Sequence, residues 1–270
     1  MSVNLQALAG AVRALADRAA AAILEVYRGD FAVRHKDDHT PLTAADLAAH
    51  RVIVAGLQAL TPDWPVLSEE AAEIPWAQRR DWHCYWLVDP LDGTREFVKR
   101  NDEFTVNIAL IEAGRPILGV IQVPVGGETG YAWRGGGAWL ATGDGTPRRI
   151  ATRRPRTPLI VAGSRSHASE RMAAMLARLG EVDLIPLGSS LKFLRVADGS
   201  ADLYVRLGPT SEWDTAAGQI LLEEAGGALT AFDGRPFTYN ARPTLLNGDF
   251  IACGDPSVDW PRRLLEDAAR

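Results

Sequence analysis

The run DPLDGT at residues 89–94 contains side chains that could hold divalent cations. Its two carboxylates, Asp89 and Asp92, lie three residues apart across a turn that contains a proline. Hard cations such as Mg²⁺ prefer oxygen ligands, and proteins often hold them with carboxylates together with a substrate phosphate. The spacing lets both carboxylates converge on one or two ions, with the carbonyl of Leu91 facing the same space. The pattern is typical of two-metal phosphoryl hydrolysis, in which the ions bridge the phosphate and lower the pKa of an attacking water.

The residues around this run could complete such a site. Gly93 allows a tight turn, and the N–H groups of Gly93 and Thr94 could then donate to phosphate oxygens. Glu69 and Asp214 are two further acids that could act as ligands. Each has an ordinary alternative, because Glu69 could be a solvated surface acid and Asp214 an acid favoured in the first turn of a helix. Asp-Pro and Asp-Gly are also common turn dipeptides.

Three motifs in a fixed order distinguish between these readings. SEE at 68–70, DPLDGTREF at 89–97 and WDTAAG at 213–218 resemble the signature of the inositol monophosphatase superfamily, which comprises lithium-sensitive, Mg²⁺-dependent phosphatases. The superfamily pattern is an acidic pair, then DPxDGTxxF, then WDxAAG, and the resemblance extends from TPLTAAD through LLEEAGG. It implies a layered α/β (α+β) sandwich of the sugar-phosphatase, inositol-monophosphatase-like type.

The resemblance also implies a role for each site residue. The metal ligands would be Glu69, Asp89, the carbonyl of Leu91, Asp92 and Asp214. Thr94, paired with Asp46, would orient and deprotonate the attacking water. Glu69 would also touch that water or a third, loosely held ion, so two or three Mg²⁺ ions are expected. The helix that begins near Asp214 would place this ligand beside the leaving-group oxygen.

Within the superfamily, the chain resembles the bacterial 3′(2′),5′-bisphosphate nucleotidases. The similarity lies in residues 87–124, in SRSHAS at 164–169, in residues 188–206 and in GPTSEWDTAAG at 208–218. It implies hydrolysis of adenosine 3′,5′-bisphosphate to AMP and phosphate, inhibition by Li⁺ and a supporting role in sulfate assimilation. An inositol-1-phosphate or fructose-1,6-bisphosphate phosphatase is the alternative enzyme. A catalytically silent nucleotide-binding scaffold is the non-enzyme alternative, against which the complete metal signature argues.

A bisphosphorylated substrate keeps its 5′-phosphate, so the enzyme needs cationic side chains away from the metals. Lys192 and Arg206 are the candidates, since arginine suits bidentate phosphate contacts. Ser189 touches the nucleotide in the resembling branch, and His167 either lines the nucleotide pocket or is a surface histidine. With these, Gly93, Thr94 and Asp214 form the predicted substrate site. The alternative places Lys192 on an exposed helix face and pairs Arg206 with a surface acid.

Hydrophobic periodicity predicts the elements that position these residues. Apolar residues at spacings of three and four predict helices over 4–27 and from Thr43 onward. The apolar runs at 66–70 and 84–90 predict strands that end in carboxylates, on a rigid support. Paired β-prone runs at 104–123 predict an antiparallel hairpin.

Further along the chain, the run GYAWRGGGAWLAT predicts a second hairpin with its glycine triplet at the turn. A helix is predicted from Trp213 to Ala225 and ends at two glycines. An Arg/Pro/Gly-rich stretch at 143–158 indicates a boundary between an N-terminal lobe, 1–150, and a C-terminal lobe, 151–270, which would carry Asp214.

The composition of the chain argues against some classes of binding partner. A net charge of −5 and a pI near 5.6 argue against a nucleic-acid-binding surface, which would be basic. The only cysteines, Cys84 and Cys253, form no disulfide framework and indicate a reducing cytoplasm. No apolar run approaches the roughly 20 residues of a membrane span. We therefore expect a cytoplasmic enzyme of a small nucleotide, and leave peripheral membrane association and oligomeric state open.

Overall fold

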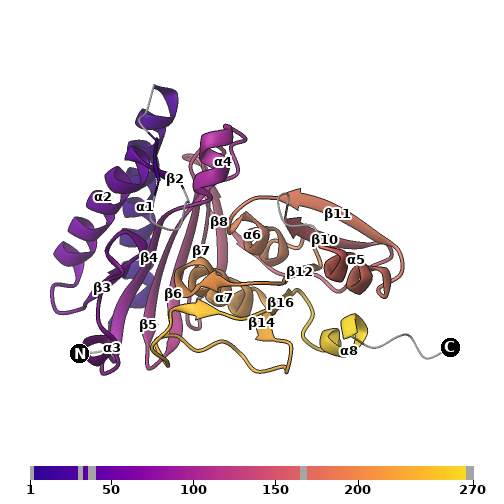
Figure 1. Ribbon diagram of the computed structural model, residues 1–270. Helices are drawn as coiled ribbons and strands as arrows, with labels where there is room; N and C mark the ends of the chain where they lie inside the picture. The colour runs from indigo at the N-terminus through magenta and orange to yellow at the C-terminus, as the bar shows by residue number, and fades with distance from the viewer. Residues whose placement is uncertain (1–2, 30–32, 36–40, 165–168, 266–270) are drawn as a thin grey trace.

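The computed structural model describes residues 3–29, 33–35, 41–164 and 169–265. Helices and sheets alternate in five layers, as Figure 1 shows from left to right. The first layer consists of helices α1 (Leu5–Arg28) and α2 (Ala44–Leu60), which cover one face of a large sheet. The layered α/β architecture predicted from the sequence is confirmed.

The large sheet has seven strands in the order β3-β4-β5-β6-β7-β8-β9. Strands β3 and β4 are parallel, and every other neighbouring pair in this sheet is antiparallel. Both predicted hairpins are confirmed as β5–β6 and β7–β8. The strands are β3 (Val66–Ser68), β4 (Cys84–Asp92), β5 (Thr105–Glu112), β6 (Arg115–Val123), β7 (Glu128–Trp133), β8 (Gly137–Thr142) and β9 (Arg148–Ile150).

Both faces of this sheet are buried, which explains the unbroken apolar runs in its sequence. Side chains alternate between faces along a strand. In β5, Ile108 packs with the helices of the first layer, whereas Ala109 packs with the middle layer. In β4, Trp86 and Leu87 divide in the same way.

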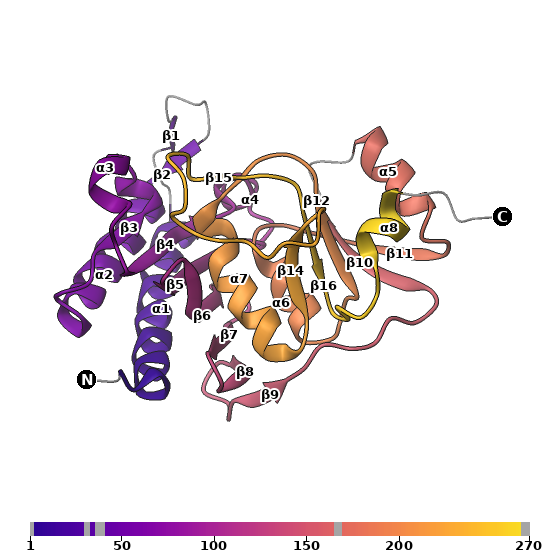
Figure 2. The same ribbon diagram turned by 90° about the horizontal axis from the view of Figure 1, so that it is seen from below.

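The middle layer consists of α6 (Leu191–Ala197) and α7 (Glu212–Ala225). It lies between the large sheet and a second sheet, as Figures 1 and 2 show. The second sheet has the order β11-β10-β12-β16-β14, and helices α5 (Glu170–Ala177) and α8 (Trp260–Leu265) cover its outer face. Its strands are β10 (Leu159–Ser164), β11 (Val182–Leu187), β12 (Leu203–Arg206), β14 (Ala228–Ala231) and β16 (Phe250–Cys253).

Short elements connect these layers. They are β1 (Val33–His35), β2 (Pro41–Thr43), the 3₁₀ turn η1 (Glu69–Ala71), α3 (Trp76–Arg79), α4 (Thr94–Lys99), β13 (Thr210–Ser211) and β15 (Leu246–Asn247). The predicted helix near Asp214 begins at Glu212, one residue earlier than expected. The division into lobes 1–150 and 151–270 stays a prediction. Among the described helices, none combines the length and apolar character needed to cross a membrane.

Candidate active site

The carboxylates of DPLDGT lie at the end of β4, where its pairing with β5 is irregular. Asp89 is opposite Asn107 and Asp92 is opposite Thr105, so β4 contains one residue more than β5 between these pairs. In a regular strand, residues three apart point to opposite faces. A bulge redirects the chain, and it therefore allows both carboxylates to reach the same space. Asp89 Oδ1 accepts a hydrogen bond from the N–H of Leu91 at 3.0 Å.

Asp214 meets these carboxylates from the first turn of α7. One carboxylate oxygen from each of Asp89, Asp92 and Asp214 lies within 4.8 Å of the others. The backbone N–H of Ser211 donates to Asp214 Oδ2 at 2.8 Å and fixes its side chain. The structure therefore brings together three predicted ligands from two distant parts of the chain.

The clustered negative charges of these carboxylates favour the binding of a cation. Burial, together with Glu69, Asp92, Asp214 and Asp46, raises the pKa of Asp89 well above its ordinary value. The pKa of Asp214 is raised by burial and by Asp92 and Glu69, although Ser211 and Arg206 oppose this. Like charges at such distances repel one another and favour the protonated carboxyl groups, whereas a bound divalent cation would favour the ionised carboxylates. The oxygen-only donor set fits Mg²⁺.

The other predicted catalytic residues surround the cluster. Glu69 lies in η1, directly after β3, and it lines one groove with Thr94, Asp89 and Asp214. Asp46 is buried in the first turn of α2, and its charge reaches Asp89. Gly93 has a φ of +94°, which glycine adopts without strain, and it leads into α4. The pairing of Thr94 with Asp46 stays a prediction.

Two polar residues that the sequence analysis did not identify hold the cluster together. Ser190 Oγ lies 2.7 Å from Asp92 Oδ2 and 3.0 Å from the carbonyl oxygen of Asp214. It accepts a hydrogen bond from Asn107 Nδ2 at 2.9 Å. Asn107 could have been noticed in the sequence, because it is an amide within a strand of apolar residues. Ser190 carries no comparable signal.

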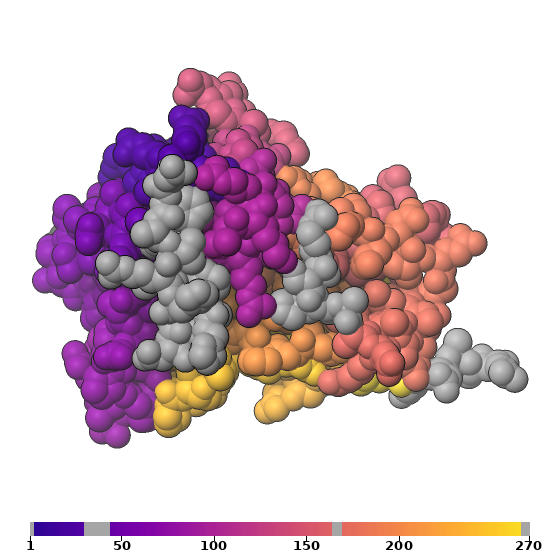
Figure 3. All heavy atoms as spheres, turned by 45° about the horizontal axis from the view of Figure 1, so that its top comes forward, coloured from indigo at the N-terminus to yellow at the C-terminus, as the bar shows by residue number. Residues whose placement is uncertain are grey.

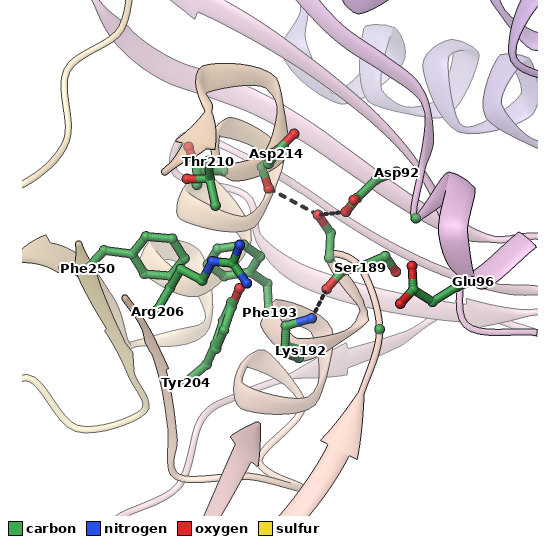
Figure 4. A pocket seen from close by; sticks show the side chains of 14 residues that line it. Asp92, Glu96, Ser189, Lys192, Phe193, Tyr204, Arg206, Thr210, Asp214 and Phe250 are labelled. Atoms are coloured by element: carbon green, nitrogen blue, oxygen red, sulfur yellow. Dashed lines mark hydrogen bonds between the residues drawn. The ribbon is translucent and has the colours of Figure 1, made fainter. Parts of the chain in front are cut away.

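A cavity opens beside the carboxylates and is lined by the predicted nucleotide-binding residues (Figure 4). Ser189, Lys192 and Arg206 lie on its wall, next to Asp92 and Asp214. Aromatic rings complete the lining: Phe193, Tyr204 and Phe250. Seen from outside, in Figure 3, the magenta segment around α4 lies between the purple N-terminal helices and the orange part of the chain.

Lys192 is buried rather than on an exposed helix face. Its ammonium group donates to the carbonyl oxygens of Leu187 at 3.2 Å and Ser189 at 2.6 Å, and it lies 5.1 Å from the ring centre of Tyr204. Burial lowers its pKa to about 8. Lys192 therefore supports the turn that contains Ser189 as well as contributing positive charge to the cavity.

Arg206 forms no ion pair with any residue in the described ranges. Its Nε is buried without a hydrogen-bond partner there, and so are Ser189 Oγ and Thr210 Oγ1 on the same cavity wall. Buried polar atoms normally have partners, so three such atoms around one cavity indicate a site for a polar ligand. A guanidinium and two hydroxyls are suited to a phosphate. His167 lies outside the described residues.

Known proteins resemble this chain over most of its length. The Inositol monophosphatase family model matches residues 4–257. The 3′(2′),5′-bisphosphate nucleotidase CysQ of Salmonella typhimurium is 50% identical over 238 residues, covering 87% of this chain and 95% of that protein. The Haemophilus influenzae protein of the same name is 40% identical, covering 87% and 88%.

Solved structures show the same architecture. CysQ from Bacteroides thetaiotaomicron, described as a bacterial member of the inositol monophosphatase family, is 39% identical with a TM-score of 0.82. That match covers 94% of this chain and 99% of the other. An inositol monophosphatase from Anabaena is 28% identical, with a TM-score of 0.76 and 98% coverage of both chains.

Proposed function

The chain belongs to the inositol monophosphatase family, and from this we propose that it is a 3′(2′),5′-bisphosphate nucleotidase. It hydrolyses the 3′-phosphate of adenosine 3′,5′-bisphosphate to AMP and phosphate, and thereby supports sulfate assimilation. The observation that carries the proposal is the position of Arg206, on a cavity wall shared with Asp92 and Asp214. One ligand can therefore place one phosphate at the carboxylates and a second at the guanidinium. Relatives that are 50% identical and bear this name support the assignment.

The metal ligands are the carboxylates that the fold brings together. Asp89, Asp92 and Asp214 would hold Mg²⁺, and Glu69 and the carbonyl of Leu91 would complete the set for two or three ions. Mg²⁺ bound here would stabilise charge at the entering and leaving oxygens and would lower the pKa of the attacking water. The oxygen-only donor set fits this hard cation.

The protein's own groups position the reacting atoms. Thr94 and Asp46 orient the attacking water and accept its proton, while the N–H groups of Gly93 and Thr94 bind phosphate oxygens. Arg206, with Ser189 and Lys192, binds the phosphate that is retained. These interactions place the ester in line for attack, which contributes much of the rate enhancement in phosphoryl transfer. The cytoplasmic location stays a prediction from the two free cysteines.

A substrate panel tests the proposal. We expect kcat/KM with Mg²⁺ to be highest for adenosine 3′,5′-bisphosphate, above inositol-1-phosphate and fructose-1,6-bisphosphate. A higher kcat/KM for inositol-1-phosphate or fructose-1,6-bisphosphate would contradict the proposed substrate, and no turnover of any of the three would favour a catalytically silent scaffold.

A variant of Arg206 tests whether this residue binds the second phosphate. Arg206→Met removes the guanidinium but keeps much of its length. We expect about tenfold or greater loss of kcat/KM for the bisphosphate, since hydrogen bonds to charged groups contribute about 1.5–3 kcal/mol. Inositol-1-phosphate has no second phosphate, so its slower hydrolysis should change little. An equal loss for both substrates would show that Arg206 does not bind the second phosphate.

A further inference from the structure

A buried glutamate lies two residues before the ligand Asp214. Glu212 is fully buried in the first turn of α7, and its Oε2 accepts a hydrogen bond from the backbone N–H of Asn240 at 2.8 Å. Residues two apart on a helix point roughly 200° apart around its axis. Glu212 therefore anchors the helix on the side opposite the carboxylate cluster.

Asn240 in turn connects this helix to α3. Its backbone is left-handed, with a φ of +52°, and its side chain is buried. The amide donates from Nδ2 to the carbonyl oxygen of Arg79 at 2.6 Å and accepts from Arg79 Nη1. Arg79 is also buried, and its guanidinium donates to the carbonyl oxygens of Arg242 and Pro243. The segment that contains α3 is thus bound to the loop 239–247.

The same loop holds the start of α7 through the backbone. The N–H of Glu212 donates to the carbonyl oxygen of Leu245 at 2.8 Å. Asn247 Nδ2 lies 3.0 Å from both the carbonyl oxygen of Ser211 and Thr215 Oγ1. Strands β13 and β15 pair at this point. We call Arg79, Glu212, Asn240 and Asn247 the latch.

The first turn of α7 needs such support. Asp214 is held close to Asp89 and Asp92, and these like charges push the turn away from β4 when no cation is bound. None of the four latch residues lines the groove or the cavity of the active site. Their contacts act on the backbone that carries Asp214, and not on the substrate.

We propose that the latch is a positioning device for the metal ligand Asp214, so that loosening it weakens divalent-cation binding without removing any ligand. The inference rests on the metal site of the proposed function. Supporting contacts of metal ligands commonly change metal affinity by about 10–100-fold when they are removed. The latch also gives a role to the segment between β3 and β4, which brings Arg79 against the loop 239–247.

Mn²⁺ binding to the complete chain, followed by electron paramagnetic resonance, tests the latch directly. Asn240→Gly is the decisive variant, because glycine keeps the left-handed backbone while the amide that binds Arg79 is lost. Arg242→Ala is a milder second variant, since this partly exposed side chain donates to Asn247 Oδ1 at 3.2 Å. We expect the Mn²⁺ Kd to rise about tenfold for Asn240→Gly and less for Arg242→Ala.

One control separates positioning from general stability. Arg153→Met breaks another partly buried ion pair, with Asp202 at 2.8 Å, and should lower Tm without changing the Mn²⁺ Kd. Unchanged Mn²⁺ affinity in both Asn240→Gly and Arg242→Ala would overturn the inference.

The readout keeps this inference separate from the proposed activity. Mn²⁺ binding requires no nucleotide, so a chain that binds Mn²⁺ but hydrolyses nothing contradicts the proposed function and still tests the latch. If the wild type hydrolyses the nucleotide and the latch variants keep their Mn²⁺ affinity, the result contradicts the role of the latch and leaves the proposed function intact.

Discussion

One hydroxyl group connects the two parts of the carboxylate cluster. Ser190 Oγ lies within hydrogen-bond distance of a side-chain oxygen of Asp92, from β4, and of the backbone carbonyl of Asp214, from α7. Asn107 donates to the same hydroxyl and so orients it. Removal of a group that holds a metal ligand in place typically lowers metal affinity or activity by about 10–100-fold.

We therefore expect Ser190→Ala to lower kcat/KM by about 10–100-fold and to raise the Mg²⁺ concentration needed for half-maximal rate. The physical reason is that Asp92 loses the contact that fixes its rotamer. Steady-state kinetics over a range of Mg²⁺ concentrations measure both effects. Ser257→Ala, which removes an equivalent hydroxyl from an exposed turn near Asp255, is the control and should leave both values unchanged.

If Ser190→Ala behaved as this control does, the hydroxyl would have no part in holding Asp92. The catalytic parameters separate that outcome from loss of folding, because a structural defect alone would lower the amount of active enzyme without changing its Mg²⁺ requirement.

At the residue scale, the sequence identified the metal ligands better than the residues that hold those ligands in place. Asp89 and Asp92 were recognisable because their spacing has a chemical meaning within one short run. Ser190 was not, because its partner Asp92 lies 98 residues away and only the tertiary fold brings the start of α6 to the end of β4. The burial of Lys192 was likewise invisible in a helix of mixed composition.

At the scale of elements, long periodic segments were predictable and short ones were not. The period of α1 reflects a face that must be buried, and the hairpins are visible in the sequence as long apolar, β-prone runs separated by turn residues. Helix α4 has only six residues and follows a left-handed glycine, and hence has too few turns to show a period. The parallel pairing of β3 with β4 was also missed, because it depends on the intervening segment.

Helix α7 depends on a close approach to the large sheet. A Cβ at Gly119 in β6 would lie 2.5 Å from the side chain of Ile220 and 2.9 Å from the backbone of Ala217. Real Cβ atoms do not come so close, so the helix can reach this depth only over a glycine. Since α7 carries Asp214, the same contact sets the distance between the two sources of ligands.

We expect Gly119→Ala to lower the free energy of unfolding by about 1–3 kcal/mol, as overpacking in a core usually does. Urea unfolding monitored by tryptophan fluorescence measures the change. Gly10→Ala is the matched control, because Gly10 lies within α1 and no described atom lies within 4 Å of the position that its Cβ would occupy. That variant should raise the free energy of unfolding by about 0.5–1 kcal/mol. A Gly119→Ala protein as stable as the wild type would show that α7 can shift outward without cost.

At the scale of the whole molecule, the site lies where three layers meet. The large sheet supplies Asp89 and Asp92, the middle layer supplies Asp214, and the second sheet supplies Arg206 on β12. Placing several carboxylates together at this junction lowers the stability of the metal-free protein. Cations that bind to the folded state would raise its stability again. Functional sites commonly oppose stability in this way.

The metal-free protein should consequently lose stability as pH rises. The pKa values of Asp89 and Asp214 are raised in the folded state, so between the ordinary pKa of an aspartate, about 4, and the raised values the folded state binds more protons than the unfolded state. The free energy of unfolding then falls with increasing pH across that window. Urea unfolding in EDTA at several pH values measures this slope, and Mg²⁺ should restore stability most at the upper end.

Asp89→Asn isolates the contribution of the cluster from that of other titrating groups. Removing one buried charge should make the metal-free protein more stable than the wild type above the window, flatten the slope with pH, and abolish both hydrolysis and the stabilisation by Mg²⁺. Asp17→Asn changes an acid whose side chain is 47% exposed and should alter none of these. The contrary result would be metal-free stability that increases with pH through this window, equally in the wild type and in Asp89→Asn. It would mean that the clustered carboxylates do not repel one another in the folded state.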